Sequence, residues 1–207
     1  MTNFEKQVLE TIKKYKLIEK NDKIVFAVSG GPDSIAMLDV IRKMCQEGNI
    51  SMAQIFVAHI NHMIRKEATE DAKYVEDYCK KNNIEFYLKS IDVQKIANNK
   101  KIGTEEAGRQ VRYEFFDEVM EKTGANKIAI AHNKNDRAET IIMNIMRGSG
   151  ISGLKGIEAK RGKYIRPLIE CERTEIEKYC EEEKLKPRID KTNFENEYTR
   201  NKIRNIA

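Results

Sequence analysis

The chain has 207 residues, of which 34% are charged and 40% hydrophobic, and its formal net charge at pH 7 is +5. This length can bury a full core and favours one large domain, and the mild basic excess permits nucleic-acid binding without arguing for it. No apolar run approaches the roughly 18 residues of a membrane-spanning helix. The stretch Met1–Lys20 is charged and amphipathic, unlike a signal peptide. We therefore expect a cytoplasmic protein without a membrane partner.

Hydrophobic periodicity predicts strands that alternate with helices. After an amphipathic N-terminal helix, strands are expected at 24–28, 53–59, 84–91 and 127–131, and helices at 34–46, 67–81, 104–123 and 136–146. A short strand at 164–168 and a helix at 172–184 are expected to follow. This order predicts an α/β fold with a doubly wound, mostly parallel sheet, in which ligands bind at the carboxyl ends of the strands.

A glycine-rich loop follows the first expected strand and opens the next helix. Its two glycines allow a tight turn and a close approach of the backbone to a ligand. Pro32 suits the first helical position after a Gly31 cap, and the helix N-terminus then offers free N–H groups to an anion. The loop lacks the Gly-Lys-Ser/Thr ending of a Walker A motif. This glycine loop, the predicted phosphate site, comprises Ser29, Gly30, Gly31, Pro32, Asp33 and Ser34.

Asp33 refines the prediction, because a carboxylate beside bound phosphates is repelled unless a cation lies between them. We therefore expect Mg²⁺ to bridge Asp33 and the phosphates. The structural alternative is a first-turn carboxylate that gains ~0.3–1 kcal/mol from the helix dipole.

All three histidines of the chain are expected at strand carboxyl ends, His59 and His62 after the second strand and His132 after the fourth. A zinc site is not expected, because the three lie on separate loops and form no short helical pair. The alternative to a ligand-binding role is that these histidines hydrogen-bond to backbone groups.

Two arginines and two acids are expected to join this edge of the sheet. An apolar i, i+4 series that starts at Val111 faces the core, which leaves Arg109 and Arg112 on another face of the helix. There the two arginines could hold an anion. The alternative for Arg109 is an exposed helical ion pair worth ~0.2–0.5 kcal/mol. Asp136 and Glu139 open the helix that follows the fourth strand. They could cap that helix as a pair, or they could help to deprotonate an incoming amine.

The four cysteines, Cys45, Cys79, Cys171 and Cys180, are far apart and form no C-x-x-C pair. Each falls in a helix-like pattern, so we expect free, half-buried thiols. Their spacing does not favour sulfur transfer or iron–sulfur chemistry, which need paired or activated thiols.

The SGGPDS loop resembles the PP-loop of the ATP pyrophosphatases, which cleave ATP between the α- and β-phosphates to adenylate a substrate. Further segments resemble the tRNA(Ile)-lysidine synthetases within that superfamily, and the glycine-rich stretch is the most diagnostic of them. These segments are AHINHMIR (58–65), EEAGRQVRY (105–113), HNKNDRAET (132–140), RGSGISGLKGI (147–157), RPL (166–168) and TRNKIR (199–204).

This resemblance implies an adenine nucleotide alpha hydrolase-like fold and a ligase that uses ATP and Mg²⁺. It would adenylate the wobble cytidine in the CAU anticodon of tRNA(Ile), and free L-lysine would then attack C2 and expel AMP, giving lysidine. The implied catalytic residues are Asp33, Arg112, His132, Asp136 and Glu139. The implied ATP-binding residues are those of the glycine loop with His59 and Arg109. The implied contacts to RNA or triphosphate are Arg65, Arg147, Arg200, Asn201 and Arg204.

The matches run from Ser29 to Arg204, so we expect residues 1–207 to form the PP-loop catalytic domain, with 170–207 as a helical extension. We expect the 207 residues not to include the further tRNA-binding domains of many family members, and we expect this chain alone to bind ATP but to hold tRNA weakly. Two alternatives stay open: a PP-loop tRNA thiolase, and a nucleotide-binding module without catalysis. The sequence also leaves a homodimer open.

Overall fold

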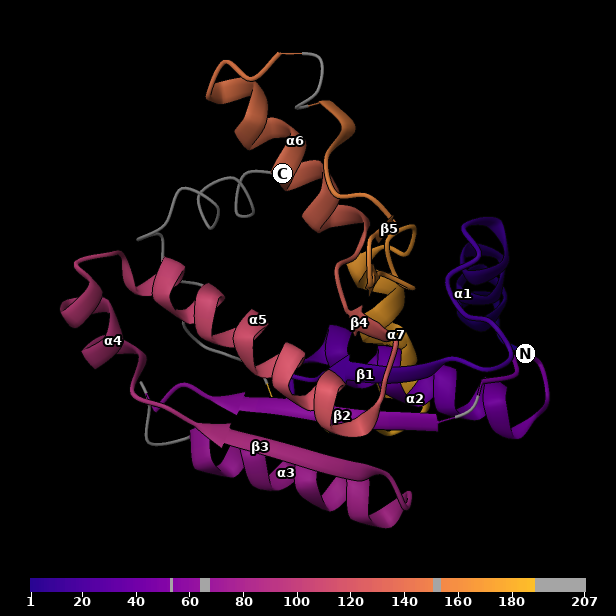
Figure 1. Cartoon of the computed structure of the whole chain (residues 1–207). Helices are drawn as coiled ribbons and strands as arrows, with labels where there is room; N and C mark the ends of the chain where they lie inside the picture. The colour runs from indigo at the N-terminus through magenta and orange to yellow at the C-terminus, as the bar shows by residue number, and fades with distance from the viewer. Residues whose placement is uncertain (53, 64–67, 151–153, 189–207) are drawn as a thin grey trace.

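The computed structural model describes residues 1–52, 54–63, 68–150 and 154–188. Helices surround one central sheet (Figure 1). The described helices are α1 Asn3–Lys14, α2 Pro32–Gln46, α3 Ala68–Lys81, α4 Val93–Lys100, α5 Thr104–Thr123, α6 Lys134–Met146 and α7 Arg173–Glu182. The described strands are β1 Lys23–Ala27, β2 Gln54–Asn61, β3 Glu85–Ser90, β4 Lys127–Ile130, β5 Lys160–Arg161 and β6 Tyr164–Ile165.

The sheet has the order β3-β2-β1-β4-β6-β5, and every pairing is parallel except that of β5 with β6. The predicted doubly wound, mostly parallel α/β fold is therefore confirmed. From β1 the chain proceeds outward through β2 to β3, and it then crosses back to place β4 on the other side of β1. The strand order thus reverses between β1 and β4, which is where open α/β sheets bind ligands.

Both faces of the sheet are covered, which explains the continuous apolar run in β1. Ile24 and Phe26 face a core formed with α1, α2, α3 and α7, whereas Val25 faces a smaller core formed with α5. All three side chains are fully buried. A strand buried on both faces needs apolar residues at successive positions rather than at alternate ones.

Several predicted boundaries were wrong for local reasons. The range of 34–46 for α2 was too short, but its start at Pro32 after a Gly31 N-cap confirms the positions predicted for these two residues. Strand β6 ends before Pro167, which has no N–H to donate to a ladder. Helix α4 and strand β5 were not predicted, because α4 is short and polar and β5 has only two residues. No helix in the described ranges is long and apolar enough to cross a membrane.

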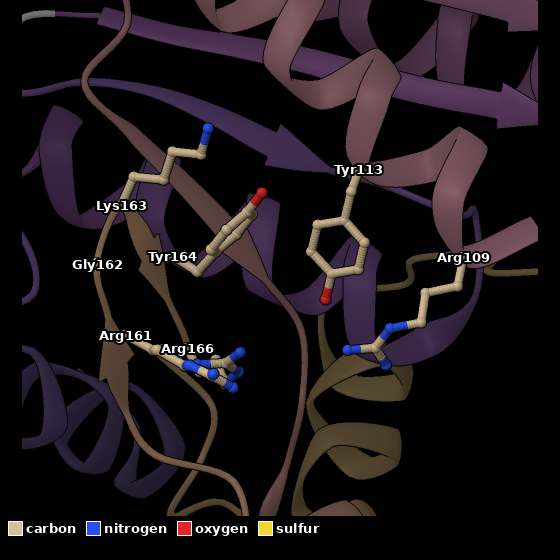
Figure 2. Close-up of a pocket in the computed structure, with 7 residues that line it drawn as sticks. All are labelled: Arg109, Tyr113, Arg161, Gly162, Lys163, Tyr164 and Arg166. Carbon is tan, nitrogen blue, oxygen red and sulfur yellow. The ribbon is translucent and has the colours of Figure 1, made fainter. Parts of the chain in front are cut away.

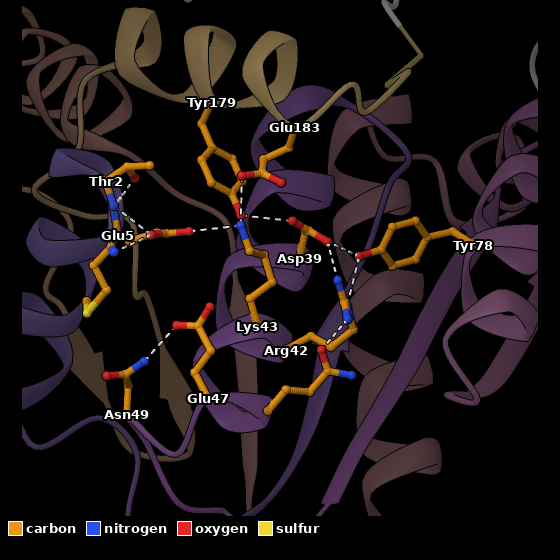
Figure 3. Close-up of polar contacts among 12 residues, drawn as sticks. Thr2, Glu5, Asp39, Arg42, Lys43, Glu47, Asn49, Tyr78, Tyr179 and Glu183 are labelled. Atoms are coloured by element: carbon orange, nitrogen blue, oxygen red, sulfur yellow. Dashed lines mark hydrogen bonds and ion pairs between the residues drawn. The ribbon is translucent and has the colours of Figure 1, made fainter.

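A buried carboxylate joins α2, α3 and α7 (Figure 3). Asp39, 4% exposed, accepts hydrogen bonds from the hydroxyls of Tyr179 and Tyr78 at 2.8 and 2.7 Å and from Arg42 Nη2 at 2.8 Å. Burial tends to raise the pKa of Asp39, but the hydrogen bonds from Arg42 and both tyrosines outweigh it and lower the pKa. Lys43 adds a second link, since its Nζ contacts a carboxylate of α1 and one just after α7. Helix α7 is therefore held to the body of the domain.

We expect Asp39→Asn to lower the free energy of unfolding by about 2 kcal/mol at pH 7, because it removes charge-assisted hydrogen bonds from a buried site. Since the pKa of Asp39 is lowered on folding, its stabilisation is present above the unfolded value of about 3.9 and is lost as the pH falls below it. Urea unfolding of both proteins should show this difference narrowing towards about pH 3. Asp77→Asn, at an exposed position of α3, is the control. A difference in the free energy of unfolding between the wild type and Asp39→Asn that is the same at pH 7 and at about pH 3 would contradict this account.

Candidate active site

The glycine loop is organised by its own side chains and by a distant segment. The Ser29 N–H donates to Ser34 Oγ at 3.1 Å, and Ser34 Oγ donates to the Gly31 carbonyl at 3.0 Å. Gly30 has a φ of +91°, a conformation that favours glycine, and its carbonyl accepts the Arg188 N–H at 2.9 Å. The loop is thus held in a fixed turn at the N-terminus of α2, where Gly31 supplies no side-chain cap. Such a terminus suits an anion.

Asp33 links this loop to the segment that follows β4. Asn133 Nδ2 donates to Asp33 Oδ1 at 2.9 Å, and Arg173 Nη2 lies 4.0 Å from Asp33 Oδ2. The side chain of Asp33 is 24% exposed, so its carboxylate can still meet a ligand. The expected meeting of residues from distant parts of the chain at one sheet edge is confirmed for these two segments.

Helix α6 is capped by Asn133 together with Asp136, rather than by Asp136 and Glu139, the pair considered as one alternative. Asn133 Oδ1 accepts the Asp136 N–H at 2.9 Å, and Asp136 Oδ2 accepts the Asn133 N–H at 3.0 Å. Consequently α6 begins at Lys134, two residues earlier than expected. Asp136 and Glu139 are 7% and 5% exposed and lie within one turn of each other on α6, and Asp136 is linked to the loop through Asn133.

His132 receives a hydrogen bond from an arginine for which the sequence predicted no role. Arg166 Nε donates to His132 Nδ1 at 3.0 Å, and Arg166 Nη1 donates to the Glu158 carbonyl at 2.8 Å. A guanidinium can only donate, so Nδ1 accepts and the proton of the neutral imidazole is on Nε2. His132 therefore presents an N–H donor at Nε2. The RPL segment includes Arg166, but the sequence could not indicate its pairing with His132, because the two residues are far apart in the chain.

His59 lies inside β2, not after it as predicted, and is 3% exposed. Its Nδ1 is 2.8 Å from the Val28 carbonyl oxygen. This contact matches the structural alternative for a histidine that bonds to the backbone. The role of His59 in ATP binding stays a prediction.

His62 follows β2 and has a buried Nδ1 without a hydrogen-bond partner among the described residues. Burial, the positive charge of Arg112 and then His59 lower the pKa of His62 to about 4, so the ring is neutral at pH 7. Arg112 therefore lies near His62, as expected for a residue at the carboxyl edge.

Arg109 lies near Arg112, and burial together with the charge of Arg109 lowers the pKa of Arg112. The predicted core series is confirmed, since Val111 is buried on α5. The Arg109 guanidinium lies 5.2 Å from the ring centroid of Tyr113, and both line an open cavity (Figure 2). Arg109 thus belongs to the cavity beside strand β6 rather than to the surroundings of His62.

The structure does not bring Arg147 to the glycine loop. Arg147 caps the far end of α6, which runs away from the sheet (Figure 1), and the helix's 13 residues span about 20 Å. The other predicted RNA or triphosphate contacts lie outside the described residues. They are Arg65, Arg200, Asn201 and Arg204.

The thiols are more buried than predicted. Cys79, Cys171 and Cys180 are buried and only Cys45 is half-buried. Burial raises the pKa of Cys45 to about 11 and the pKa values of the other three to about 12.

Within the described part of the chain, no three His, Cys, Asp or Glu side chains gather into a metal-binding cluster. The prediction that zinc is absent remains untested.

The family model of the PP-loop domain matches residues 1–207. The chain belongs to the PP-loop domain family. It is 58% identical over 199 residues to a tRNA(Ile)-lysidine synthase of Clostridium acetobutylicum and 52% identical over 199 residues to that of Caldanaerobacter subterraneus. These matches cover 95% and 96% of the chain but only 42% of each relative. The PP-loop chain therefore spans less than half the length of the curated relatives it matches.

Solved structures of other enzymes share the fold. The U34-tRNA thiolase NcsA from Methanococcus maripaludis, solved with its [4Fe-4S] cluster, superposes with a TM-score of 0.77 at 19% identity, covering 98% of this chain and 72% of that one. The NH3-dependent NAD synthetase from Campylobacter jejuni gives a TM-score of 0.55 at 16% identity, covering 92% and 74%. At such identities the likeness shows the PP-loop fold alone.

We expect Arg166→Met to release the tautomer of His132, because the substitution removes the donor to Nδ1 but keeps most of the side-chain length. Proton–nitrogen correlation spectra of the imidazoles should show the Nε2–H form in the wild-type chain and a mixture of tautomers in the variant. Arg161→Met is the matched control, since it removes a neighbouring guanidinium that makes no described contact with His132. Unchanged ring-nitrogen shifts in Arg166→Met would refute the assignment.

Proposed function

We propose that this chain is the PP-loop catalytic domain of a tRNA(Ile)-lysidine synthase. It would ligate lysine to C2 of the wobble cytidine in the CAU anticodon of tRNA(Ile), through an adenylated cytidine. The observation that carries the proposal is the 2.9 Å hydrogen bond from Asn133 to Asp33, which joins the phosphate-binding loop to the acid-bearing helix α6. The named relatives support the choice of substrates.

In the first step, the C2 oxygen of cytidine attacks the α-phosphorus of ATP and pyrophosphate leaves. The backbone N–H groups at the start of α2 would bind the departing pyrophosphate. Asp33 fits a Mg²⁺ ion, because this ion is commonly held by one or two carboxylates together with substrate phosphates. When bound, Mg²⁺ would neutralise charge on the leaving group. Arg112 would stabilise the negative charge that develops on the nucleotide.

In the second step, the ε-nitrogen of lysine attacks C2, the C2–O bond breaks and AMP leaves. Asp136 and Glu139, both nearly buried on α6, would orient the cationic amine and accept its proton. The Nε2–H of His132 would donate a hydrogen bond to the departing oxygen. Lysidine formation would thus use two acids, one histidine donor and one arginine from separate elements. An anticodon base suits this chemistry because an unpaired loop base can enter a site.

The thiolase alternative requires an activated or cluster-binding thiol. Buried thiols with pKa values of about 11 to 12 stay protonated at neutral pH and are poor nucleophiles or ligands. A nucleotide-binding module without catalysis does not need the two buried acids of α6. Both alternatives are therefore disfavoured. The cytoplasmic location remains a prediction of this proposal, and a homodimer remains open.

The assay is incubation of the chain with ATP, Mg²⁺, lysine and a transcript of tRNA(Ile) with a CAU anticodon. We expect pyrophosphate release and a lysine adduct on the RNA, detected by mass spectrometry. Replacing lysine with a sulfur donor tests the thiolase directly. ATP binding without pyrophosphate release under any condition would support the inactive module and contradict the proposal.

In the same assay, Asp33→Asn should reduce pyrophosphate release by about a hundredfold or more, because it removes the carboxylate expected to hold the cation beside the phosphates. Asp77→Asn, an exposed carboxylate on α3, should leave the rate unchanged. Full activity of Asp33→Asn would contradict the role assigned to Asp33.

A further inference from the structure

A second anion-attracting region lies apart from the glycine loop. It is an open cavity of about 540 Å³ between α5 and the hairpin of β5 and β6 (Figure 2). The guanidinium groups of Arg109, Arg161 and Arg166 point into the space between these two elements, whereas the Lys163 ammonium points away from them. The lining residues are Arg109, Tyr113, Arg161, Gly162, Lys163, Tyr164 and Arg166.

The lining of this basic cavity carries four cationic side chains and, among the residues described, no carboxylate. Asp117 lies at its margin, where its Oδ1 is 2.7 Å from Lys163 Nζ, so one of the charges is partly balanced. Arg166 is 8% exposed, and burial together with the charges of Arg161 and Arg109 lowers the pKa of its guanidinium, although Tyr113 and Glu158 act in the opposite direction. Cations held together in this way repel one another, and an anion would relieve that repulsion.

Aromatic rings stand among these charges. The rings of Tyr113 and Tyr164 meet edge to face, with centroids 5.2 Å apart and planes at 84°. Arg109 lies over the Tyr113 ring and Lys163 over the Tyr164 ring, at 5.2 and 5.7 Å from the centroids. Basic groups that follow a backbone, combined with aromatic rings, are the usual means of binding single-stranded nucleic acid.

The basic cavity borders the candidate active site through one residue. Arg166 lines the cavity and donates its Nε–H to His132. His132 follows β4 and is adjacent in sequence to Asn133, which donates a hydrogen bond to Asp33 of the glycine loop. A ligand in the cavity would therefore reach towards the reacting groups without using the glycine loop. That loop already offers a site for the pyrophosphate part of ATP, so the phosphates expected in the cavity come from another molecule.

We propose that the basic cavity binds the phosphodiester backbone of the single-stranded RNA segment beside the nucleoside to be modified. Arg161 and Lys163 of the hairpin contact phosphate, and Tyr113 and Tyr164 contact the sugar or base next to it. This inference rests on the proposed function, since it takes RNA as the substrate. Because phosphate contacts carry no base information, the cavity adds affinity and register, not sequence preference.

The test compares the 207-residue chain with Arg161→Ala/Lys163→Ala and with the control Lys160→Ala. Lys160 lies on the same hairpin, but it does not line the cavity and its Nζ is 3.5 Å from the Lys16 carbonyl oxygen. Fluorescence anisotropy of a labelled anticodon-loop oligonucleotide and of a labelled ATP analogue is measured across a series of salt concentrations. Circular dichroism establishes that each variant is folded.

We expect the double variant to bind RNA about tenfold or more weakly than the wild-type chain at low salt. The slope of log K against log salt should fall by about 0.7 for each phosphate that the variant no longer neutralises. Affinity for ATP should change less than twofold, and Lys160→Ala should bind both ligands almost as the wild-type chain does. An oligonucleotide of scrambled sequence should show the same decrease in affinity.

An equal decrease of RNA binding in Lys160→Ala would overturn the proposal, because general surface charge would then suffice. Loss of ATP binding with RNA binding retained would assign the cavity to the nucleotide and also overturn it. The proposal would also be overturned if the wild-type chain did not bind the oligonucleotide at low salt. Failure of the proposed function is separate, since it would appear as absence of the lysine adduct while RNA binding still depends on Arg161 and Lys163.

Discussion

The candidate site depends on one constraint of a parallel sheet, namely that neighbouring strands end at the same edge. Ala27 and Ile130 are paired at the ends of β1 and β4, so the segments that follow both strands start side by side. Asn133, fully buried, then donates to Asp33 and caps α6 in the same place. One amide side chain thus fixes the position of the glycine loop, the start of α6 and the two acids that α6 carries.

Local backbone chemistry explains which parts of the site could be predicted from sequence. Gly31 and Pro32 specify the start of α2 because their conformational preferences act within a single turn. His132 and the acids of α6 were predictable because the end of a buried strand can be recognised from its apolar run. Asn133 was missed, since Asp136 and Glu139 offered an equally plausible cap and only the tertiary fold brings Asn133 to Asp33.

The basic cavity could not be predicted for a different reason. Its hairpin consists of two-residue strands, which are too short to show periodicity, and the pairing of β6 with β4 is set by contacts distant in sequence. The RPL segment drew attention to Arg166, but the sequence did not indicate that Arg166 would bond to His132. Two buried charges elsewhere in the domain are balanced: Lys127 pairs with Asp22 at 2.6 Å, and Asp39 accepts from three donors. Stability and ligand attraction therefore rely on different groups of charges.

The central claim is that the glycine loop and Asp33 form the phosphate site at the junction of β1 and β4. A crystal structure of the chain with a non-hydrolysable ATP analogue and Mg²⁺ tests this claim most directly. We expect phosphate oxygens that accept hydrogen bonds from the backbone of residues 30–34, with Mg²⁺ about 2.1 Å from a carboxylate oxygen of Asp33. An analogue whose phosphates lie instead among Arg161, Lys163 and Arg166, with none at the glycine loop, would contradict the claim.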